Sequence, residues 1–74
     1  NMDINEKVGG NIRATRILGN MSIEEFSLRL NLPLNRVNEI EEGKEDIHLD
    51  LLFEIADVLE VTPGFLINDN PVLM

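Results

Sequence analysis

The stretch from Ser22 to Lys44 reads SIEEFSLRLNLPLNRVNEIEEGK, which is the pattern of two short helices joined by a tight turn. Ser22 and Glu25 have the spacing of a capping box, in which each side chain binds the backbone N–H of the other residue. Phe26 and Leu30 lie one helical turn apart and give this segment one apolar face. The pattern therefore predicts a first helix of the pair over residues 22–30.

The second helix of the pair follows after a short turn. Asn31 is one of the few residues besides glycine that tolerate a left-handed backbone, so it suits the end of the preceding helix. Pro33 fits the start of a new helix, Val37 and Ile40 give that helix a buried stripe, and Gly43 ends it. Helix, turn and helix in this order hold one helix outward, so that its exposed face can enter a groove. The same pattern also fits a plain αα-hairpin in a small helical domain.

A helix is predicted before this pair, over residues 3–18. Val8 and Ile12 recur at the spacing of one turn and indicate its buried face. Gly9 and Gly10 should each weaken the helix by up to about 1 kcal/mol relative to alanine.

Residues 49–60 give the strongest helical pattern of the chain. Leu51 and Val58 lie off the main apolar stripe of this segment, so they belong either to the edge of the core or to a partner surface. Thr62 as a cap and Pro63 at the first helical position then predict a short last helix. The main stripe of residues 49–60 consists of Leu52, Ile55, Ala56 and Leu59.

The composition indicates one small helical domain in a chain of 74 residues. No cysteine is present, which excludes disulfides, thiolate metal sites and thiol nucleophiles and fits a reducing cytoplasm. No apolar run has membrane-spanning length, and we expect no signal peptide. We expect residues 1–7 to be a lead-in that begins with a cloning remnant at Asn1, residues 8–67 to form the domain, and residues 68–74 to be a tail.

The net charge of −8 comes from 14 acidic and 6 basic residues, and it is unevenly spread. Residues 1–31 carry four of each sign, whereas residues 32–74 carry two bases, Arg36 and Lys44, and ten acids. A protein that binds nucleic acid normally gains most of its affinity by neutralising phosphates. The acidic half therefore predicts weak non-specific binding to DNA, or in the simpler interpretation it only keeps the domain soluble.

Catalysis is not indicated by any motif. His48 is the only histidine, and a lone histidine at a helix entrance is typical of a surface or capping residue rather than of a metal ligand or a general base. No nucleophile–base pair, phosphate-binding loop or metal-ligand cluster is present, and Ser22 is explained as a cap. We expect no enzymatic activity, no cofactor or metal, and no small-molecule site.

The order of these elements resembles the helix-turn-helix domain of phage repressors and Cro proteins, which many bacterial regulators share. The resemblance runs from about residue 8 to residue 66 and implies an all-α, five-helix fold like that of the lambda repressor. Its most specific part is the run from Ile40 to Lys44, with Ala56 thirteen residues after Gly43. The residues that carry it are Ile12 and Arg16, Ser22-x-Glu24-Glu25-Phe26-Ser27, Leu30-Asn31-Leu32, Val37-x-x-Ile40-Glu41-x-Gly43-Lys44, Leu49, Leu52, Ile55-Ala56, Leu59, Val61 and Phe65-Leu66.

The resemblance implies that residues 34–41 form a recognition helix in the major groove. Leu34, Asn35 and Glu39 match the positions that read bases. Leu34 would touch a thymine methyl group, Asn35 would bind adenine through two hydrogen bonds, and Glu39 would accept from the amino group of cytosine. Contacts to the DNA backbone, or support of the recognition helix, would come from Ser22, Ile23, Arg36, Asn38, Lys44 and His48.

Three other positions are implied to be structural. Arg16 and Glu41 would form a partly buried ion pair that ties the first helix to the recognition helix. Ser27 stands where the family usually has alanine, and a small residue there would let the helices before and after the turn approach closely.

Four residues depart from the pattern of the family. Ile23 stands where a glutamine commonly contacts both a phosphate and the recognition helix, and Pro33 replaces the usual serine or threonine cap. Glu42 and Asp46 occupy positions where asparagine, arginine or lysine often approach phosphates. Negative charges that face DNA would weaken its binding.

Two functions fit these observations. The first is a sequence-specific DNA-binding domain of a transcriptional regulator, which binds double-stranded DNA and dimerises through its last helix and C-terminal tail. The second is a protein-interaction or oligomerisation module on the same fold, with a degenerate and acidic DNA face. The second interpretation is favoured by the acidic half and by spare apolar residues, namely Leu51, Val58, Val72, Leu73 and Met74.

Overall fold

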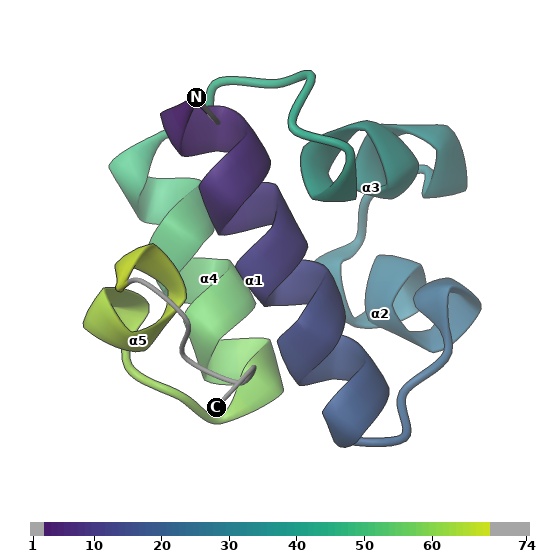
Figure 1. The fold of residues 1–74 in the computed structure, drawn as a ribbon. Helices are drawn as coiled ribbons and strands as arrows, with labels where there is room; N and C mark the ends of the chain where they lie inside the picture. Colours follow the sequence, from purple (N-terminus) through teal and green to yellow (C-terminus); the bar gives the residue numbers. More distant parts are fainter. Residues whose placement is uncertain (1–2, 69–74) are drawn as a thin grey trace.

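The computed structural model describes residues 3–68, and within that range the chain forms five α-helices and no strand (Figure 1). The five-helix, all-α fold expected from the sequence is thereby confirmed. None of these helices has the length and apolar character that crossing a bilayer requires. The helices are α1 (Ile4–Leu18), α2 (Ile23–Leu30), α3 (Leu34–Glu41), α4 (Leu49–Leu59) and α5 (Pro63–Ile67).

Helix α1 lies at the centre of the arrangement, between the α2–α3 pair on one side and α4 and α5 on the other (Figure 1). Its first turn is closed by a complete capping box between Asp3 and Glu6, which the sequence analysis did not identify. Helix α1 agrees with the helix predicted over residues 3–18, so residues 4–7 of the expected lead-in are part of this helix. Of the expected tail, Asn68 is described and residues 69–74 lie outside the described residues.

The capping box predicted for α2 forms only in part. The Ser22 hydroxyl accepts a hydrogen bond from the backbone N–H of Glu25 at 3.0 Å, as expected. The Glu25 carboxylate does not return to Ser22 but contacts Arg29, at 3.1 Å from Nε and 2.9 Å from Nη2. That half of the prediction is wrong, because an arginine one turn away on the same face offers charge-assisted bonds in place of one neutral N–H.

The turn between α2 and α3 has the predicted conformation. Asn31 adopts the left-handed region with φ of 58°, and Gly43 ends α3 with φ of 78°. The Ser27 hydroxyl donates to the carbonyl of Leu32, whose own N–H donates back to the Ser27 carbonyl. Pro33 precedes α3 as its N-cap and provides no side-chain hydrogen bond.

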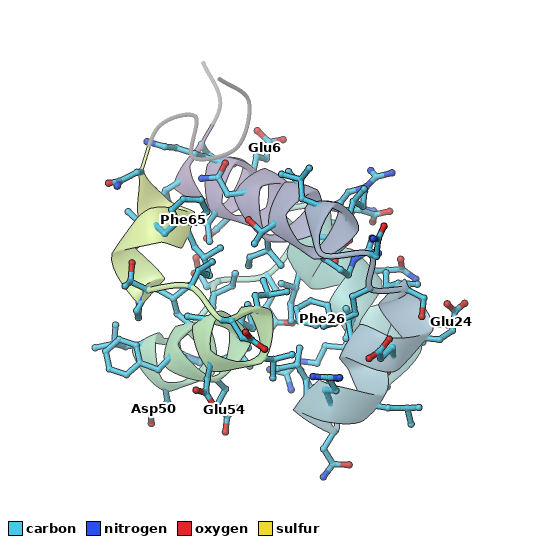
Figure 2. The ribbon with its side chains drawn as sticks, turned by 90° about the horizontal axis from the view of Figure 1, so that it is seen from below. Glu6, Glu24, Phe26, Asp50, Glu54 and Phe65 are labelled. Carbon is cyan, nitrogen blue, oxygen red and sulfur yellow. The ribbon has the colours of Figure 1, made fainter. Side chains whose placement is uncertain are left out.

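The core is built from apolar side chains of all five helices, and Figure 2 shows Phe26 in the interior while Glu24, Asp50 and Glu54 point outward. Leu51 is buried and Val58 is half-buried against the same core, so neither is a spare surface residue. Among residues 3–68, the large side chains with no exposed surface are Ile12, Phe26, Val37, Ile40, Ile55 and Leu66.

Gly9 is a point of close packing between α1 and α3. A Cβ atom at this position would overlap the carbonyl oxygen of Ile40 and lie 2.8 Å from that of Glu41. Gly10 has nothing within 4 Å of the corresponding position. Helix propensity alone predicts that both glycines weaken the helix, but Gly9 is the residue that allows α3 to approach α1.

A buried asparagine holds the end of the domain. The Asn11 side-chain amide of α1 donates to the carbonyls of Leu66 and Asn68, at 2.8 and 2.9 Å. These bonds satisfy two carbonyls at the end of α5, which is too short to be stable without tertiary contacts. The sequence pattern did not identify this role.

Candidate nucleic-acid interface

Helix α3 presents one face to the core and the other to solvent. Val37 and Ile40 are completely buried, as the sequence predicted. Leu34, Asn35, Asn38 and Glu39 are all exposed. Since these four positions follow the i, i+1, i+4, i+5 spacing, they form one continuous outward ridge.

The ion pair between Arg16 and Glu41 fixes the position of α3 on α1. Arg16 Nε lies 2.7 Å from Glu41 Oε2, and Arg16 Nη2 lies 3.0 Å from Oε1, so the contact is bidentate. Arg16 Nη1 also donates to the carbonyl of Met21, at 2.8 Å. Because the side chains are only 10% and 4% exposed, solvent screens this pair little.

Arg36 projects from α3 toward the loop that follows, and Glu45 of that loop binds its guanidinium. Arg36 Nε lies 3.1 and 3.2 Å from the two Glu45 oxygens, and Nη2 lies 2.8 Å from Oε2. Hydrogen bonding to Arg36 lowers the pKa of Glu45, and the same bond raises the pKa of Arg36. Both groups therefore remain charged at neutral pH, and the positive charge of α3 is neutralised within the domain.

The other basic residue near α3 is also next to an acid. Lys44 Nζ lies 3.3 Å from Glu42 Oε1, with both side chains largely exposed. His48 precedes α4 at the N-cap position, exposed and without a side-chain capping bond. Asp46, which departs from the family pattern, accepts from the side-chain amide of Asn5 at 2.8 Å and so attaches the loop to α1.

The residues expected at the start of α2 have two different roles. Ser22 is exposed and caps the helix, which leaves the other first-turn N–H groups directed outward. Ile23 is half-buried and packs against the core, so its side chain supports the fold.

Glu45 is the one residue of this region that the sequence analysis missed. It lies nine positions after Arg36, a spacing that matches no helical or strand pattern, and its role depends on how the loop folds back over α3. From residue 34 to residue 48 the chain carries two basic and five acidic residues. Among those acids, Glu41 is neutralised from outside the segment, by Arg16.

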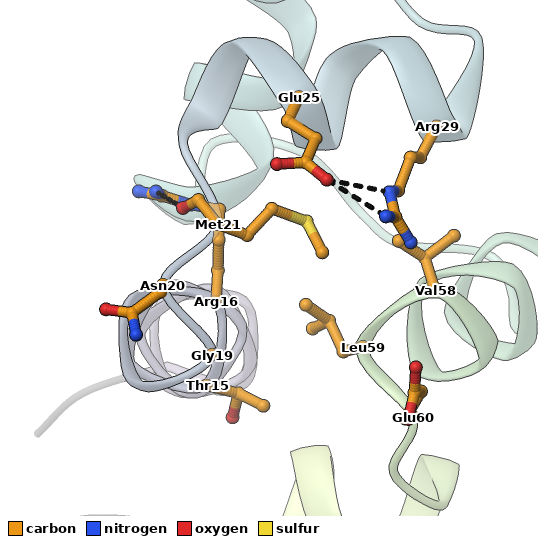
Figure 3. Close-up of a pocket in the computed structure, with 10 residues that line it drawn as sticks. All are labelled: Thr15, Arg16, Gly19, Asn20, Met21, Glu25, Arg29, Val58, Leu59 and Glu60. Carbon is orange, nitrogen blue, oxygen red and sulfur yellow. Dashed lines mark hydrogen bonds and ion pairs between the residues drawn. The ribbon is translucent and has the colours of Figure 1, made fainter.

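A pocket of about 360 Å³ lies away from this region, between the end of α1, α2 and the end of α4 (Figure 3). Figure 3 shows Glu25 and Arg29 joined across its upper edge, with Leu59 below them. The lining includes no residue of α3 or of the loop after it. Within residues 3–68 no three histidine or acidic side chains are grouped as metal ligands would be.

Known proteins include a matching family and solved structures with a similar fold. A family model described as Helix-turn-helix matches residues 12–66, and no protein with a curated description matches the chain. The crystal structure of the clp gene regulator ClgR from Corynebacterium glutamicum has a TM-score of 0.84 and 17% identity, over 88% of this chain and 69% of that one. A second ClgR structure has a TM-score of 0.85 and 17% identity, over 89% and 86%.

The restriction-modification controller protein C.AhdI from Aeromonas hydrophila is also similar. Its TM-score is 0.77 and its identity 24%, over 82% of this chain and 92% of that one. Across all three structures the resemblance is one of fold.

Proposed function

Since this chain belongs to the helix-turn-helix family of DNA-binding domains of transcriptional regulators, we propose that α3 is its recognition helix and enters the major groove of double-stranded DNA. The observation that carries this proposal is the outward ridge of α3, held against α1 by the buried pair of Arg16 and Glu41. A rigid helix with a polar exposed face is what reading base edges requires. We further propose a cytoplasmic location, because the domain has to reach DNA.

Specificity is proposed to come from Leu34, Asn35 and Glu39. All three are exposed on α3, and the first two lie in its first turn, which is the part of a recognition helix that meets base edges. Asn35 suits adenine, Glu39 suits the cytosine amino group, and Leu34 suits a thymine methyl group. Asn38 follows on the same ridge, where it can hold a phosphate or a neighbouring side chain.

Phosphates are proposed to meet the first turn of α2 after Ser22, with Ile23 holding that turn against the core. Lys44, Arg36 and His48 would approach the backbone from the other end of α3 and the start of α4. These contacts position the domain without reading sequence.

Replacing Asn35 by alanine is expected to weaken binding to the preferred duplex by about 1–3 kcal/mol, because the adenine contact is lost. Binding to duplexes of mixed sequence should change little. Lys44→Gln should instead weaken binding to both kinds of duplex alike and reduce the salt dependence by about one phosphate contact. Fluorescence anisotropy on duplexes selected from a random pool measures both variants, and equal losses for N35A on every sequence would contradict the role of Asn35.

A homodimer is proposed to form through α4 and α5, because helix-turn-helix regulators read two half-sites with two copies. Phe53 on α4 and Ile67 on α5 are 52% and 41% exposed although both are apolar, and Leu49 lies one turn before Phe53. Helix α5 lies on the opposite side of α1 from α3, so this contact leaves α3 free (Figure 1). The contribution expected of the C-terminal tail falls on residues 69–74, outside the described range.

Phe53→Glu is expected to raise the dimer dissociation constant by about 10- to 100-fold, because a charge replaces a central apolar contact. Leu28→Glu is the matched control, since Leu28 is 81% exposed and lies on α2, which is not part of the proposed interface. Sedimentation equilibrium over a concentration series measures both. An unchanged constant for F53E, or an equal change for L28E, would contradict this interface.

The protein-interaction module remains the second candidate, and one observation favours it. Both cations near the α3 ridge are paired with carboxylates, Arg36 with Glu45 and Lys44 with Glu42. Selection of duplexes from a random pool, repeated over a salt series, separates the two functions. An enriched motif whose binding weakens with salt supports the DNA reader, whereas no retained DNA even at low salt supports the module.

A further inference from the structure

One edge of the Arg36 guanidinium, formed by Nε and Nη2, is already occupied in the free domain. Glu45 binds it through both carboxylate oxygens, at 2.8–3.2 Å, in the geometry that a guanidinium also uses to bind a phosphate. The Arg36 and Glu45 side chains are 42% and 22% exposed, so the carboxylate is the more enclosed member of the pair. A DNA phosphate that binds Arg36 through Nε and Nη2 therefore has to compete with a partner that is already in place, whereas Nη1 is not contacted by Glu45.

Glu45 is held at Arg36 by the loop that carries it. Gly43 packs against the backbone of Glu6, where a Cβ would lie 2.6 Å from Cα. Asp46 accepts a hydrogen bond from Asn5, and Ile47 packs against the core. Gly43 and Asp46, which lie on either side of Glu45, are thus held against α1, and Ile47 is held by the core. Because the loop is already fixed in this way, Glu45 reaches Arg36 at little further cost in conformational entropy.

We propose that Glu45 competes with DNA phosphates for the guanidinium of Arg36 and thereby keeps the affinity of this domain for DNA low. This inference rests on the proposed function, because it concerns the regulation of the same interface. The bound carboxylate acts in two ways: it occupies the Nε and Nη2 donors, which a phosphate would use for a two-point contact, and it adds a negative charge next to the place where the phosphate would sit. Weak binding away from the preferred site is the consequence, since contacts to phosphates supply almost all non-specific affinity.

Glu45→Gln tests this competition directly. The glutamine keeps an oxygen that can accept from Arg36 but removes the negative charge. Binding to a fluorescein-labelled duplex of mixed sequence should tighten about tenfold at low salt, and the plot of log affinity against log salt should steepen by about 0.9, the value of one added phosphate contact. Fluorescence anisotropy between about 50 and 200 mM salt gives both quantities.

Glu54→Gln is the matched control, because Glu54 is an exposed acid on α4 and its replacement changes the net charge equally. It should leave the salt slope unchanged. Arg36→Gln introduced into the E45Q variant should remove the gain in affinity and the added slope, which shows that the freed guanidinium produces them. Circular dichroism melting curves verify that each variant is folded.

The outcomes separate this inference from the function on which it rests. If the wild-type domain binds the duplex with a negative salt slope and E45Q binds it equally or more weakly, the competition is refuted and the DNA-binding function stands. If E54Q reproduces the change seen with E45Q, net charge alone is responsible and the competition is again refuted. If neither wild type nor E45Q binds at low salt, both proposals fail.

Discussion

Replacing Arg16 by methionine is expected to lower the free energy of unfolding by about 3–5 kcal/mol, the largest loss for any single substitution considered in this domain. Methionine retains the length of the side chain but leaves the Glu41 carboxylate, only 4% exposed, without its cation. It also removes the donor to the Met21 carbonyl. A domain of this size has a small reserve of stability, so the variant should be largely unfolded at room temperature.

Urea denaturation followed by circular dichroism measures this loss. Adding Glu41→Leu to the Arg16→Met variant should restore much of the stability, because the stranded charge is then removed as well. Glu25→Gln provides the control, since it breaks a pair with Arg29 whose side chains are about half exposed and should cost at most about 0.5 kcal/mol. Equal costs for the buried and the exposed pair would show that the burial of Arg16 and Glu41 has no energetic role.

Gly9→Ala is expected to destabilise the domain by about 1–3 kcal/mol, although alanine normally favours a helix. The added methyl group would overlap the backbone carbonyl of Ile40 and press on that of Glu41. Since backbone atoms cannot rotate away, α1 and α3 would have to separate. That movement would also lengthen the ion pair between Arg16 and Glu41.

Gly10→Ala is the natural comparison, because it makes the same chemical change one residue later on an exposed face with open space around it. It should stabilise the domain by about 0.5–1 kcal/mol through helix propensity alone. Thermal and urea unfolding of the two variants should therefore shift in opposite directions. Shifts of the same sign would mean that α1 and α3 do not pack as closely at Gly9 as the structure indicates.

What the sequence determined by itself was the local structure. The helices, the left-handed turn at Asn31, the stop at Gly43 and the buried stripe of Val37 and Ile40 follow from spacing and backbone preferences over a few residues. These preferences act within one or two helical turns, so a pattern of adjacent residues contains them. The pair of Arg16 and Glu41 was reached only through the family resemblance, because nothing in its spacing of 25 residues indicates contact.

The tertiary structure alone decided how distant polar groups meet. In the folded domain Gly9 is the point where α1 and α3 pack against each other, and the Asn11 side chain binds the end of α5. It also placed Leu51 in the core and gave Arg36 a carboxylate partner in Glu45. A side chain on a helix can face any neighbour that packing brings near it, and packing is a property of the whole chain. For that reason the sequence identified the exposed ridge of the proposed recognition helix, whereas only the folded domain showed that its single arginine is paired with Glu45.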